Sequence, residues 1–342
     1  MTAPIRLAIF GLGRWGEHLV RNFLALPEAR VVAVIDPQAE ALARLQDQFG
    51  LPDSVQGLTD WRAAMDLPGL EAVAIATPAA THYPLIKTAL ERHLHVLTEK
   101  PMTLTVAECQ ELCTLAAQHQ LQLVVDHTYL FHPAVKAAKQ VFVENRLGCL
   151  RYGYAARTHL GPVRSDVDAL WDLVIHDIAI LNFWLEAVPV QVAAWGNAWL
   201  QPQPQPLFPT GLADVGWVRL VYPNQFEATL HVSWLNADKQ RRLGVVGDQG
   251  TLVFDELAPN RLTLYQGAIQ GEAAPFLPSG VAPLPLPDDR TQPLTQVCKH
   301  FLARIQGQAE PEVSGGAIAT HLVKTLTALS QSLQTGGTLI SL

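Results

Sequence analysis

Three polar residues next to apolar sequence have the side-chain types that can remove a proton from an alcohol. Lys100 follows a strand-like run and precedes a proline, and a lysine there can hydrogen-bond a hydroxyl and stabilise the alkoxide. Asp172 and His176 are four residues apart, so on a helix they face the same way. Histidine titrates near neutral pH and can take the proton, while a nearby carboxylate orients it. The three together favour proton removal ahead of hydride transfer.

Each of these residues also has a plainer interpretation. Alone, Lys100 would be a solvated surface lysine, and Asp172 with His176 could be a buried pair that only pins a helix. Polar residues on an apolar helix are costly unless they are partnered or used. The position of Lys100 at the end of a strand, with the Asp–His pair downstream, favours the catalytic interpretation.

A glycine-rich turn predicts a place for a dinucleotide. It follows the apolar run 5–10, precedes helical spacing and reads Gly11-Leu12-Gly13-Arg14-Trp15-Gly16. The first glycine permits a sharp turn, the second lets the backbone approach a pyrophosphate, and the third allows close helix–strand packing. The helix that follows directs its N–H groups at the phosphates.

Asp36 lies twenty positions beyond Gly16, at the end of the next strand. A carboxylate there accepts hydrogen bonds from ribose hydroxyls and repels a 2′-phosphate, which favours NAD over NADP. The alternative is a glycine turn followed by an Asp that merely caps the next segment. Arg14 leaves room for NADP because it could reach a 2′-phosphate, but it could equally lie along the pyrophosphate or point to solvent.

Further cofactor contacts are expected where later strands end, because ligands of doubly wound sheets bind at the carboxyl ends of strands. Thr77 and Pro78 end one strand, and Glu99 precedes Lys100 at the end of another. His82 is either beside the cofactor or a capping or surface histidine. The predicted cofactor-binding residues are Gly11, Gly13, Arg14, Trp15, Gly16, Asp36, Thr77, Pro78, His82, Glu99 and Lys100.

The elements that position these residues alternate along the first 126 residues. Strands are expected at 5–10, 30–35, 71–77, 95–97 and 121–125, and helices at 15–26, 38–49, 84–92 and 105–118. The last helix begins with a capping box. This alternation predicts an α/β domain of the Rossmann type over residues 1–126, with a doubly wound parallel sheet covered on both faces.

Residues 127–342 predict a second, α+β domain with an open, largely antiparallel sheet. Helices are expected at 133–145, at 169–186 and after Gly315. Strands are expected at 150–158, 190–199, 215–222, 226–234, 243–246 and 251–254, with a hairpin turn at 248–250. Proline-rich loops are expected at 201–209 and 273–293.

Composition excludes several classes of protein. The 342 residues suffice for two domains, and 49% hydrophobic with 16% charged residues predicts a large core. A net charge of −7 argues against a nucleic-acid surface. The N-terminus lacks the apolar core of a signal peptide, and no run approaches the ~20 residues of a membrane helix. We therefore expect a cytoplasmic protein without nucleic-acid or membrane partners.

The four cysteines predict free thiols rather than a metal site. Cys109 and Cys113 share a helix face, but no second Cys/His pair has zinc-like spacing. Free thiols suit a reducing cytosol.

Four segments together resemble the Gfo/Idh/MocA family of NAD(P)-dependent sugar and polyol oxidoreductases. They are residues 11–16, 76–82, 99–101 and 172–177, and the ending 315–342 is similar too. The resemblance implies a Rossmann domain followed by a substrate-binding domain whose open sheet often forms a homodimer or homotetramer interface. It also implies reversible oxidation of a secondary alcohol. Lys100 would anchor and activate the hydroxyl, His176 would act as general acid or base, and Asp172 would position the substrate.

Two further stretches, 126–133 and 164–172, are similar to family members that act on nucleotide sugars. These members resemble UDP-N-acetylglucosamine or UDP-N-acetylglucosaminuronate 3-dehydrogenases, which favours a UDP-N-acetylhexosamine or its uronate as substrate. Asp168 stands where such members often have Asn, and it could alter hydrogen bonding at the sugar. Arg164 could meet a carboxylate or phosphate, or lie at the surface. His127 could line the pocket or be a buried structural histidine.

Two other functions stay open at this point. An inositol or a free sugar could be the substrate instead of a nucleotide sugar. A non-catalytic, dinucleotide-binding regulatory protein is the second alternative, and the presence of Lys100, Asp172 and His176 together argues against it.

Overall fold

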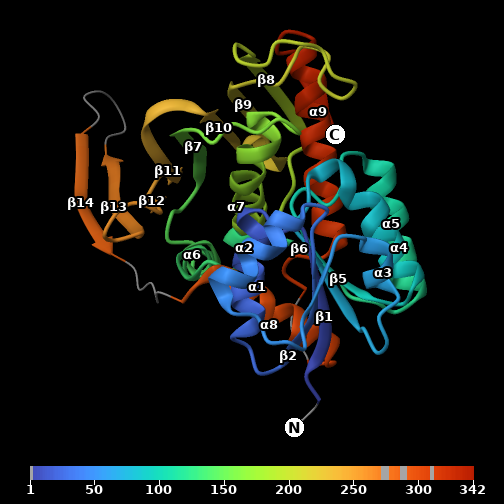
Figure 1. Cartoon of the computed structure of the whole chain (residues 1–342). Coiled ribbons are helices and arrows are strands. Elements are labelled where there is room, and N and C mark those ends of the chain that lie inside the picture. The colour runs from blue at the N-terminus through green and yellow to red at the C-terminus, as the bar shows by residue number, and fades with distance from the viewer. Residues whose placement is uncertain (1–2, 271–276, 286–290, 309–311) are drawn as a thin grey trace. The chain divides into compact units, whose positions relative to one another are not determined.

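The computed structural model describes residues 3–270, 277–285, 291–308 and 312–342. The chain divides into two compact units. One unit consists of Met1–Phe131 with Gln292–Val323, and the other of His132–Thr291 with Lys324–Leu342. Each unit is therefore assembled from two separate stretches of chain, which the colours of Figure 1 make visible.

A six-stranded parallel sheet forms the centre of the first unit. Its strands are β1 (Ile5–Phe10), β2 (Ala29–Ile35), β3 (Gln56–Leu58), β4 (Ala72–Ile75), β5 (His95–Glu99) and β6 (Leu123–Asp126). They lie in the order β3-β2-β1-β4-β5-β6. The strand order reverses between β1 and β4, and such a switch point leaves a crevice at the carboxyl ends of the strands. The predicted doubly wound Rossmann sheet is confirmed.

Helices cover both faces of this sheet, and the strands are accordingly apolar along most of their length. Helices α1 (Arg14–Leu24) and α8 (Pro293–Ile305) pack together on one face, and α4 (His82–Glu91) and α5 (Val106–Gln118) on the other (Figure 1). The remaining helices and turns are α2 (Ala39–Phe49), α3 (Trp61–Met65), η1 (Ala79–Thr81) and η2 (Thr128–Phe131). The expected cap of α5 is present, because the Thr105 hydroxyl accepts a hydrogen bond from Glu108 N at 3.3 Å.

A nine-stranded sheet forms the second unit. Its strands are β7 (Leu150–Leu160), β8 (Gln191–Asn197), β9 (Val215–Val221), β10 (Glu227–Ser233), β11 (Leu235–Gly247), β12 (Gly250–Asp255), β13 (Leu262–Gln270), β14 (Leu277–Pro285) and β15 (Ile340–Ser341). They lie in the order β14-β13-β12-β11-β7-β10-β9-β8-β15. Only β7 and β10 pair in parallel among these strands of the described chain. The expected open, largely antiparallel sheet is confirmed.

Several expectations for the second sheet need correction. The strand expected at 243–246 is part of the 13-residue β11, and the sequence pattern does not predict β13. The loop expected at 273–293 is wrong for residues 277–285, which form the edge strand β14, a position where proline is tolerated because one side needs no hydrogen bonds. Residues 273–276 and 286–290 of that expected loop lie outside the described residues.

The helices of the second unit are α6 (Pro133–Val143), α7 (Ile175–Leu185) and the last part of α9 (Gly316–Gln334), with a short turn η4 (Pro223–Gln225). The helix expected at 169–186 begins with a π-helical turn, η3 (Leu170–Val174), before α7. The Trp171 indole N–H in this turn donates to Ser330 Oγ of α9 at 2.8 Å. No helix in the described part of the chain is long and apolar enough to cross a membrane.

Candidate active site and cofactor site

The three glycines of the turn between β1 and α1 have distinct geometries. Gly11 has a φ of +84°, and a Cβ there would lie 2.6 Å from the Ala76 carbonyl oxygen. A Cβ at Gly16 would overlap the Gly11 carbonyl oxygen, whereas at Gly13 it would meet nothing within 4 Å. Open space at Gly13 leaves the backbone accessible to a phosphate. No side chain caps the first turn of α1, so its N–H groups suit an anion.

Asp36 ties the end of β2 to this turn. Its Oδ2 accepts a hydrogen bond from Leu12 N at 2.8 Å, and its Oδ1 accepts one from Gln38 N at 2.9 Å. The side chain remains partly exposed, and a carboxylate can accept more than two hydrogen bonds. The residues present therefore fit a dinucleotide, because the glycine turn leaves backbone N–H groups open to a pyrophosphate and Asp36 has further acceptor capacity beside that turn.

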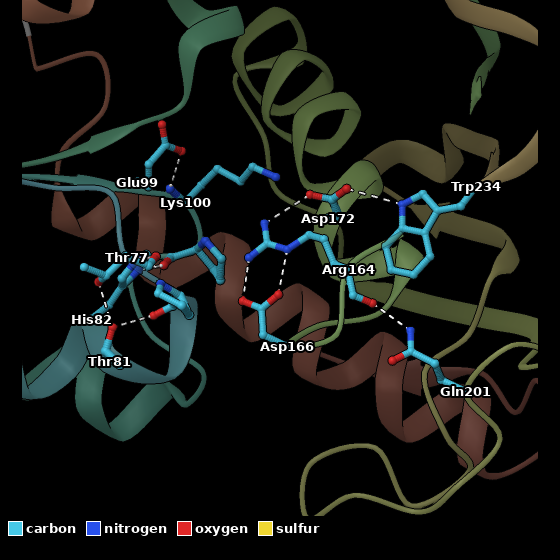
Figure 2. Close-up of polar contacts among 12 residues, drawn as sticks. Thr77, Thr81, His82, Glu99, Lys100, Arg164, Asp166, Asp172, Gln201 and Trp234 are labelled. Atoms are coloured by element: carbon cyan, nitrogen blue, oxygen red, sulfur yellow. Dashed lines mark hydrogen bonds and ion pairs between the residues drawn. The ribbon is translucent and has the colours of Figure 1, made fainter. Parts of the chain in front are cut away.

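His82 joins the end of β4 to the turn that carries Lys100 (Figure 2). The imidazole is buried, with Nδ1 2.8 Å from the Pro101 carbonyl oxygen and Nε2 2.9 Å from that of Thr77. Both partners are acceptors, so a doubly protonated ring would donate to each. The Thr81 hydroxyl donates to Thr77 Oγ1 at 2.7 Å and stiffens the same turn, in which Pro78 precedes η1. The Lys100–Pro101 peptide is cis.

Lys100 is 6% exposed and directly follows β5. Its backbone N–H donates to Glu99 Oε2 at 3.3 Å (Figure 2). His127, just after β6, is buried, and burial with the charge of Lys100 lowers its pKa to about 3. Neither ring nitrogen of His127 receives or donates a hydrogen bond among the described residues. A neutral imidazole therefore lies near the lysine.

Asp172 belongs to η3 in the second unit and is held from two sides (Figure 2). Arg164 Nη1 donates to Asp172 Oδ1 at 3.3 Å, and the Trp234 indole N–H donates to Oδ2 at 3.3 Å. Arg164 also donates two hydrogen bonds to the Asp166 carboxylate, from Nε at 2.8 Å and from Nη2 at 2.6 Å. The Gln201 amide donates to the Arg164 carbonyl oxygen at 2.7 Å, so the proline-rich loop is attached to this cluster.

The guanidinium of Arg164 remains charged between these carboxylates. Burial disfavours its charge, but the hydrogen bonds that it donates to Asp166 and the charge of Asp172 outweigh that effect and raise the pKa of Arg164. Three of its N–H groups are engaged. Arg164 therefore orients Asp172 in this structure.

His176 emerges from the same apolar segment as Asp172. Within residues 171–180, these two side chains are partly exposed and the other eight residues are buried. The pair that pins this helix is a different one. Arg157 of β7 donates to both carboxylate oxygens of Asp177, at 3.0 Å and 2.7 Å, with both side chains buried. Asp172 and His176 are thus the two partly exposed side chains of this segment.

Asp168 is fully buried and caps the π-helical turn. Its Oδ1 accepts a hydrogen bond from Trp171 N at 2.9 Å, while Oδ2 receives none from any residue that the structure describes. Burial raises the pKa of Asp168 to about 7, although the backbone N–H groups oppose the shift.

Asp166 and Trp234 are partners in this cluster that the sequence pattern does not indicate. Asp166 lies within the stretch 164–172, but nothing in the sequence pairs it with Arg164. Trp234 is 62 residues from Asp172, and only the sheet brings them together. The described residues contain no group of three or more His, Cys, Asp or Glu that could hold a metal.

The doubly wound sheet and its glycine turn define a dinucleotide-binding protein of the Rossmann type. Residues 5–127 match the model of an oxidoreductase family with an NAD-binding Rossmann fold. Residues 135–253 match the GFO/IDH/MocA C-terminal domain. The chain belongs to the Gfo/Idh/MocA family of oxidoreductases, which are NAD(P)-dependent sugar dehydrogenases.

Three relatives illustrate the range of the family. UDP-N-acetylglucosamine 3-dehydrogenase of Acidithiobacillus ferrooxidans is 29% identical over 245 residues, covering 70% of this chain and 71% of the relative. The scyllo-inositol 2-dehydrogenase (NAD(+)) of Bacillus subtilis is 28% identical over 206 residues, covering 58% of each chain. The crystal structure of a putative oxidoreductase from Magnetospirillum magnetotacticum MS-1 is 30% identical, with a TM-score of 0.78, covering 96% of this chain and 100% of that one.

Proposed function

We propose that this chain is an NAD-dependent dehydrogenase that oxidises a secondary alcohol of a nucleotide sugar, favouring a UDP-N-acetylhexosamine or its uronate. The main support for an enzymatic function is the partial exposure of Asp172 and His176 in the otherwise buried segment 171–180. A pair that served only to pin the helix would be buried, as Arg157 and Asp177 are.

Three side chains divide the chemistry in this proposal. Lys100 hydrogen-bonds the reacting hydroxyl and stabilises the alkoxide. His176 takes the hydroxyl proton as general base and returns it in the reverse direction. Asp172, held by Arg164 and Trp234, positions the substrate hydroxyls. NAD, when bound, would supply the acceptor for the hydride that leaves the substrate carbon.

The cofactor is held by residues of the first unit. The glycine turn and the N-terminus of α1 receive the pyrophosphate, with Arg14 and Trp15 alongside. The Asp36 carboxylate accepts hydrogen bonds from the ribose hydroxyls and would repel a 2′-phosphate, which favours NAD over NADP. The nicotinamide half of the cofactor is bound near Thr77, Pro78, His82 and Glu99. His82 contributes by holding the carbonyl groups of Thr77 and Pro101 in place.

The nucleotide-sugar assignment is supported by the similarity to UDP-N-acetylglucosamine 3-dehydrogenase and by the stretches 126–133 and 164–172. In this assignment Asp168, His127 and Arg164 act near the substrate, Asp168 and Arg164 by orienting Asp172. An inositol is the second candidate substrate, because a scyllo-inositol dehydrogenase is similar at nearly the same identity.

We also propose that the protein is a homodimer or homotetramer formed through the second sheet. Trp195, Trp217 and His231 are direct neighbours on β8, β9 and β10. The rings of Trp217 and His231 stack with centroids 5.1 Å apart, and both tryptophans are exposed. Contiguous exposed aromatic surface is typical of an interface. The four cysteines are free, which supports the expected cytoplasmic location.

Absorbance at the NADH band tests the function directly. Purified protein and NAD are mixed with UDP-sugars, inositols and free hexoses, each in a separate reaction. A rise with UDP-N-acetylhexosamines or their uronates supports the proposal, and a rise confined to inositols or hexoses selects the second candidate. If NAD binds but no compound is oxidised, even with an enzyme that recycles NADH, the non-catalytic alternative is favoured.

A further inference from the structure

His159 and Arg241 form a polar pair in the second unit that the mechanism above does not use. Arg241 Nη2 of β11 lies 3.0 Å from His159 Nδ1 of β7. Arg241 Nη1 donates to two carbonyl oxygens, that of Thr158 at 3.1 Å and that of Gln240 at 2.9 Å. Both residues of the pair are partly exposed. The guanidinium is therefore held against the two strands while it contacts the imidazole.

The pair lies on the face of the second sheet that packs against α7. Arg157 is two residues before His159 in β7, so their side chains point to the same face, and Arg157 reaches Asp177 of α7. Arg241 is paired with Arg157 across β7 and β11 and shares this face. The strand register and the 3.0 Å contact agree on the position of both side chains.

Trp234 joins this face of the sheet to Asp172. Val232 of β10 pairs in parallel with Arg157, so Trp234 and His159, each two residues further along, continue the same face. The Trp234 indole N–H donates to Asp172 Oδ2 at 3.3 Å. The charge of Asp172 also acts on His159. His159 therefore lies near the carboxylate that the proposed function assigns to the substrate hydroxyls.

Arg241 determines which nitrogen of His159 carries the proton. A guanidinium can only donate hydrogen bonds, so His159 Nδ1 accepts one and is unprotonated. Burial and the charge of Arg241 lower the pKa of His159, which keeps the imidazole neutral near pH 7. A neutral imidazole carries its one proton on the other nitrogen, Nε2. No described residue accepts a hydrogen bond from Nε2, so this N–H is available to a ligand.

The charges around this N–H favour an anionic acceptor. The positive charges of Arg241 and the exposed Lys239 act on the ring of His159. The negative charge of Asp172 opposes them and is itself bound by Arg164. A hydrogen bond to an ionised acceptor is about twice as strong as one between neutral groups. A uronate has a carboxylate where the parent hexosamine has a hydroxymethyl group, and therefore offers such an acceptor.

We propose that His159, fixed by Arg241, donates its Nε2–H to the carboxylate of a hexuronate and so selects the uronate over the parent hexosamine. The choice of a nucleotide sugar rests on the proposed function, which this inference narrows to the uronate. The tautomer of His159 is a property of the protein alone. Its measurement therefore does not depend on which substrate is oxidised.

Nuclear magnetic resonance of the protein labelled with ¹⁵N in its histidines tests the tautomer without cofactor or substrate. His159→Gln identifies the His159 signals by their loss. Slightly above neutral pH, these signals should show an unprotonated Nδ1 and a protonated Nε2. Arg241→Met breaks the pair, so the signals should move toward the mixture of tautomers of a solvated histidine. A protonated Nδ1 in the wild type would overturn the inference.

The ratio of kcat/KM for UDP-N-acetylglucosaminuronate to that for UDP-N-acetylglucosamine tests the ligand. His159→Leu removes the donor, so the ratio should fall about tenfold or more. His159→Gln retains an N–H donor at about the reach of Nε2 and should keep most of the ratio. His321→Leu, at an exposed position on α9, is the matched control and should keep the wild-type ratio.

An unchanged ratio in His159→Leu would refute recognition of the carboxylate. An equal loss on both substrates would point to the diphosphate that they share, and no loss on either would leave His159 outside the site. A wild-type protein that oxidises only the hexosamine would overturn the inference and leave the proposed function standing. If neither UDP-sugar is oxidised, the nucleotide-sugar proposal fails together with the uronate, and the tautomer still decides whether Arg241 fixes His159.

Discussion

Lys100 is the residue on which the proposed chemistry depends most directly. Lys100→Met retains most of the length of the unbranched side chain but removes its charge. We expect kcat to fall about 10²- to 10³-fold or more, while the affinity for NAD, measured by calorimetry, stays within several-fold. Lys87→Met is the control, because Lys87 is a surface residue paired with Glu111. Full activity in Lys100→Met would remove this lysine from the mechanism.

In the proposed function, Asp36 determines the preference for NAD over NADP. Asp36→Ala removes the acceptor for the ribose hydroxyls and the repulsion of a 2′-phosphate, so NAD binding should weaken about tenfold and NADP binding much less. Titration calorimetry with both dinucleotides measures the two affinities. The exposed Asp47 of α2 supplies the control variant Asp47→Ala. A preference for NAD that survives in Asp36→Ala would contradict the assigned role.

Individual site residues differ in how far the sequence could reveal them. The glycine turn and Asp36 are recognisable because strand, turn, helix and acid follow one another within the chain. Trp234 is not, because its partner Asp172 lies in η3, 62 residues away along the chain. Local patterns report what a residue is near in sequence, whereas the hydrogen bond between Trp234 and Asp172 is a product of the folded chain.

At the scale of single elements, the π-helical turn η3 is the main departure from expectation. Apolar spacing predicts a helix over 169–186 but does not report a local shift in hydrogen-bond register. The same limit applies to β3, whose three residues are too few to show periodicity. The proline-rich strand β14 has a composition that favours loops and is tolerated only because it is an edge.

The cap of η3 predicts an unusual pH dependence of stability. Burial raises the pKa of Asp168 to about 7 in the folded protein, above the usual ~3.9 of an unfolded chain. The folded state therefore binds this proton more tightly, and its contribution to the free energy of unfolding falls as pH rises from about 4 to 7. Asp168→Asn keeps a capping oxygen and removes this dependence.

Urea unfolding at pH 5 and pH 8 measures this effect. Relative to wild type, Asp168→Asn should gain stability between the two values, by about 3 kcal/mol at most, because the effect extends only from pH 5 to the folded pKa near 7. Asp53→Asn, at an exposed position, should show no such gain. Equal stability differences at both pH values would show that Asp168 is ionised in the folded protein.

The end of β10 supports η3 through Trp234. Trp234→Phe retains most of the ring but loses the N–H donated to Asp172, so kcat/KM should fall about fivefold to tenfold. The thermal unfolding midpoint reports any accompanying loss of packing. Trp199→Phe, at an exposed position, should leave kcat/KM unchanged. If the two variants behave alike, Trp234 does not position Asp172.

At the scale of the whole chain, the first unit depends on a segment that the strand–helix alternation does not predict. Ser314 pairs with Val125 of the edge strand β6 through two hydrogen bonds, at 2.9 Å and 2.6 Å. Arg304 of α8 donates to Gln122 Oε1 at 2.9 Å. Covering an edge strand in this way protects it from pairing with other chains. The alternation ends near residue 125, so only the folded chain reveals this return.

The exposed face of the second sheet predicts how copies of the chain associate. Stable interfaces bury at least about 1,000 Å², and the Trp195–Trp217–His231 row offers contiguous aromatic area for a symmetric contact. Replacing both tryptophans, Trp195→Glu with Trp217→Glu, places like charges opposite one another in such a contact. Sedimentation velocity should then show monomers or a smaller assembly, with the far-ultraviolet circular dichroism spectrum unchanged. Val143→Glu, at an exposed position on α6, should keep the wild-type mass, and the same mass in the double variant would exclude this face as the interface.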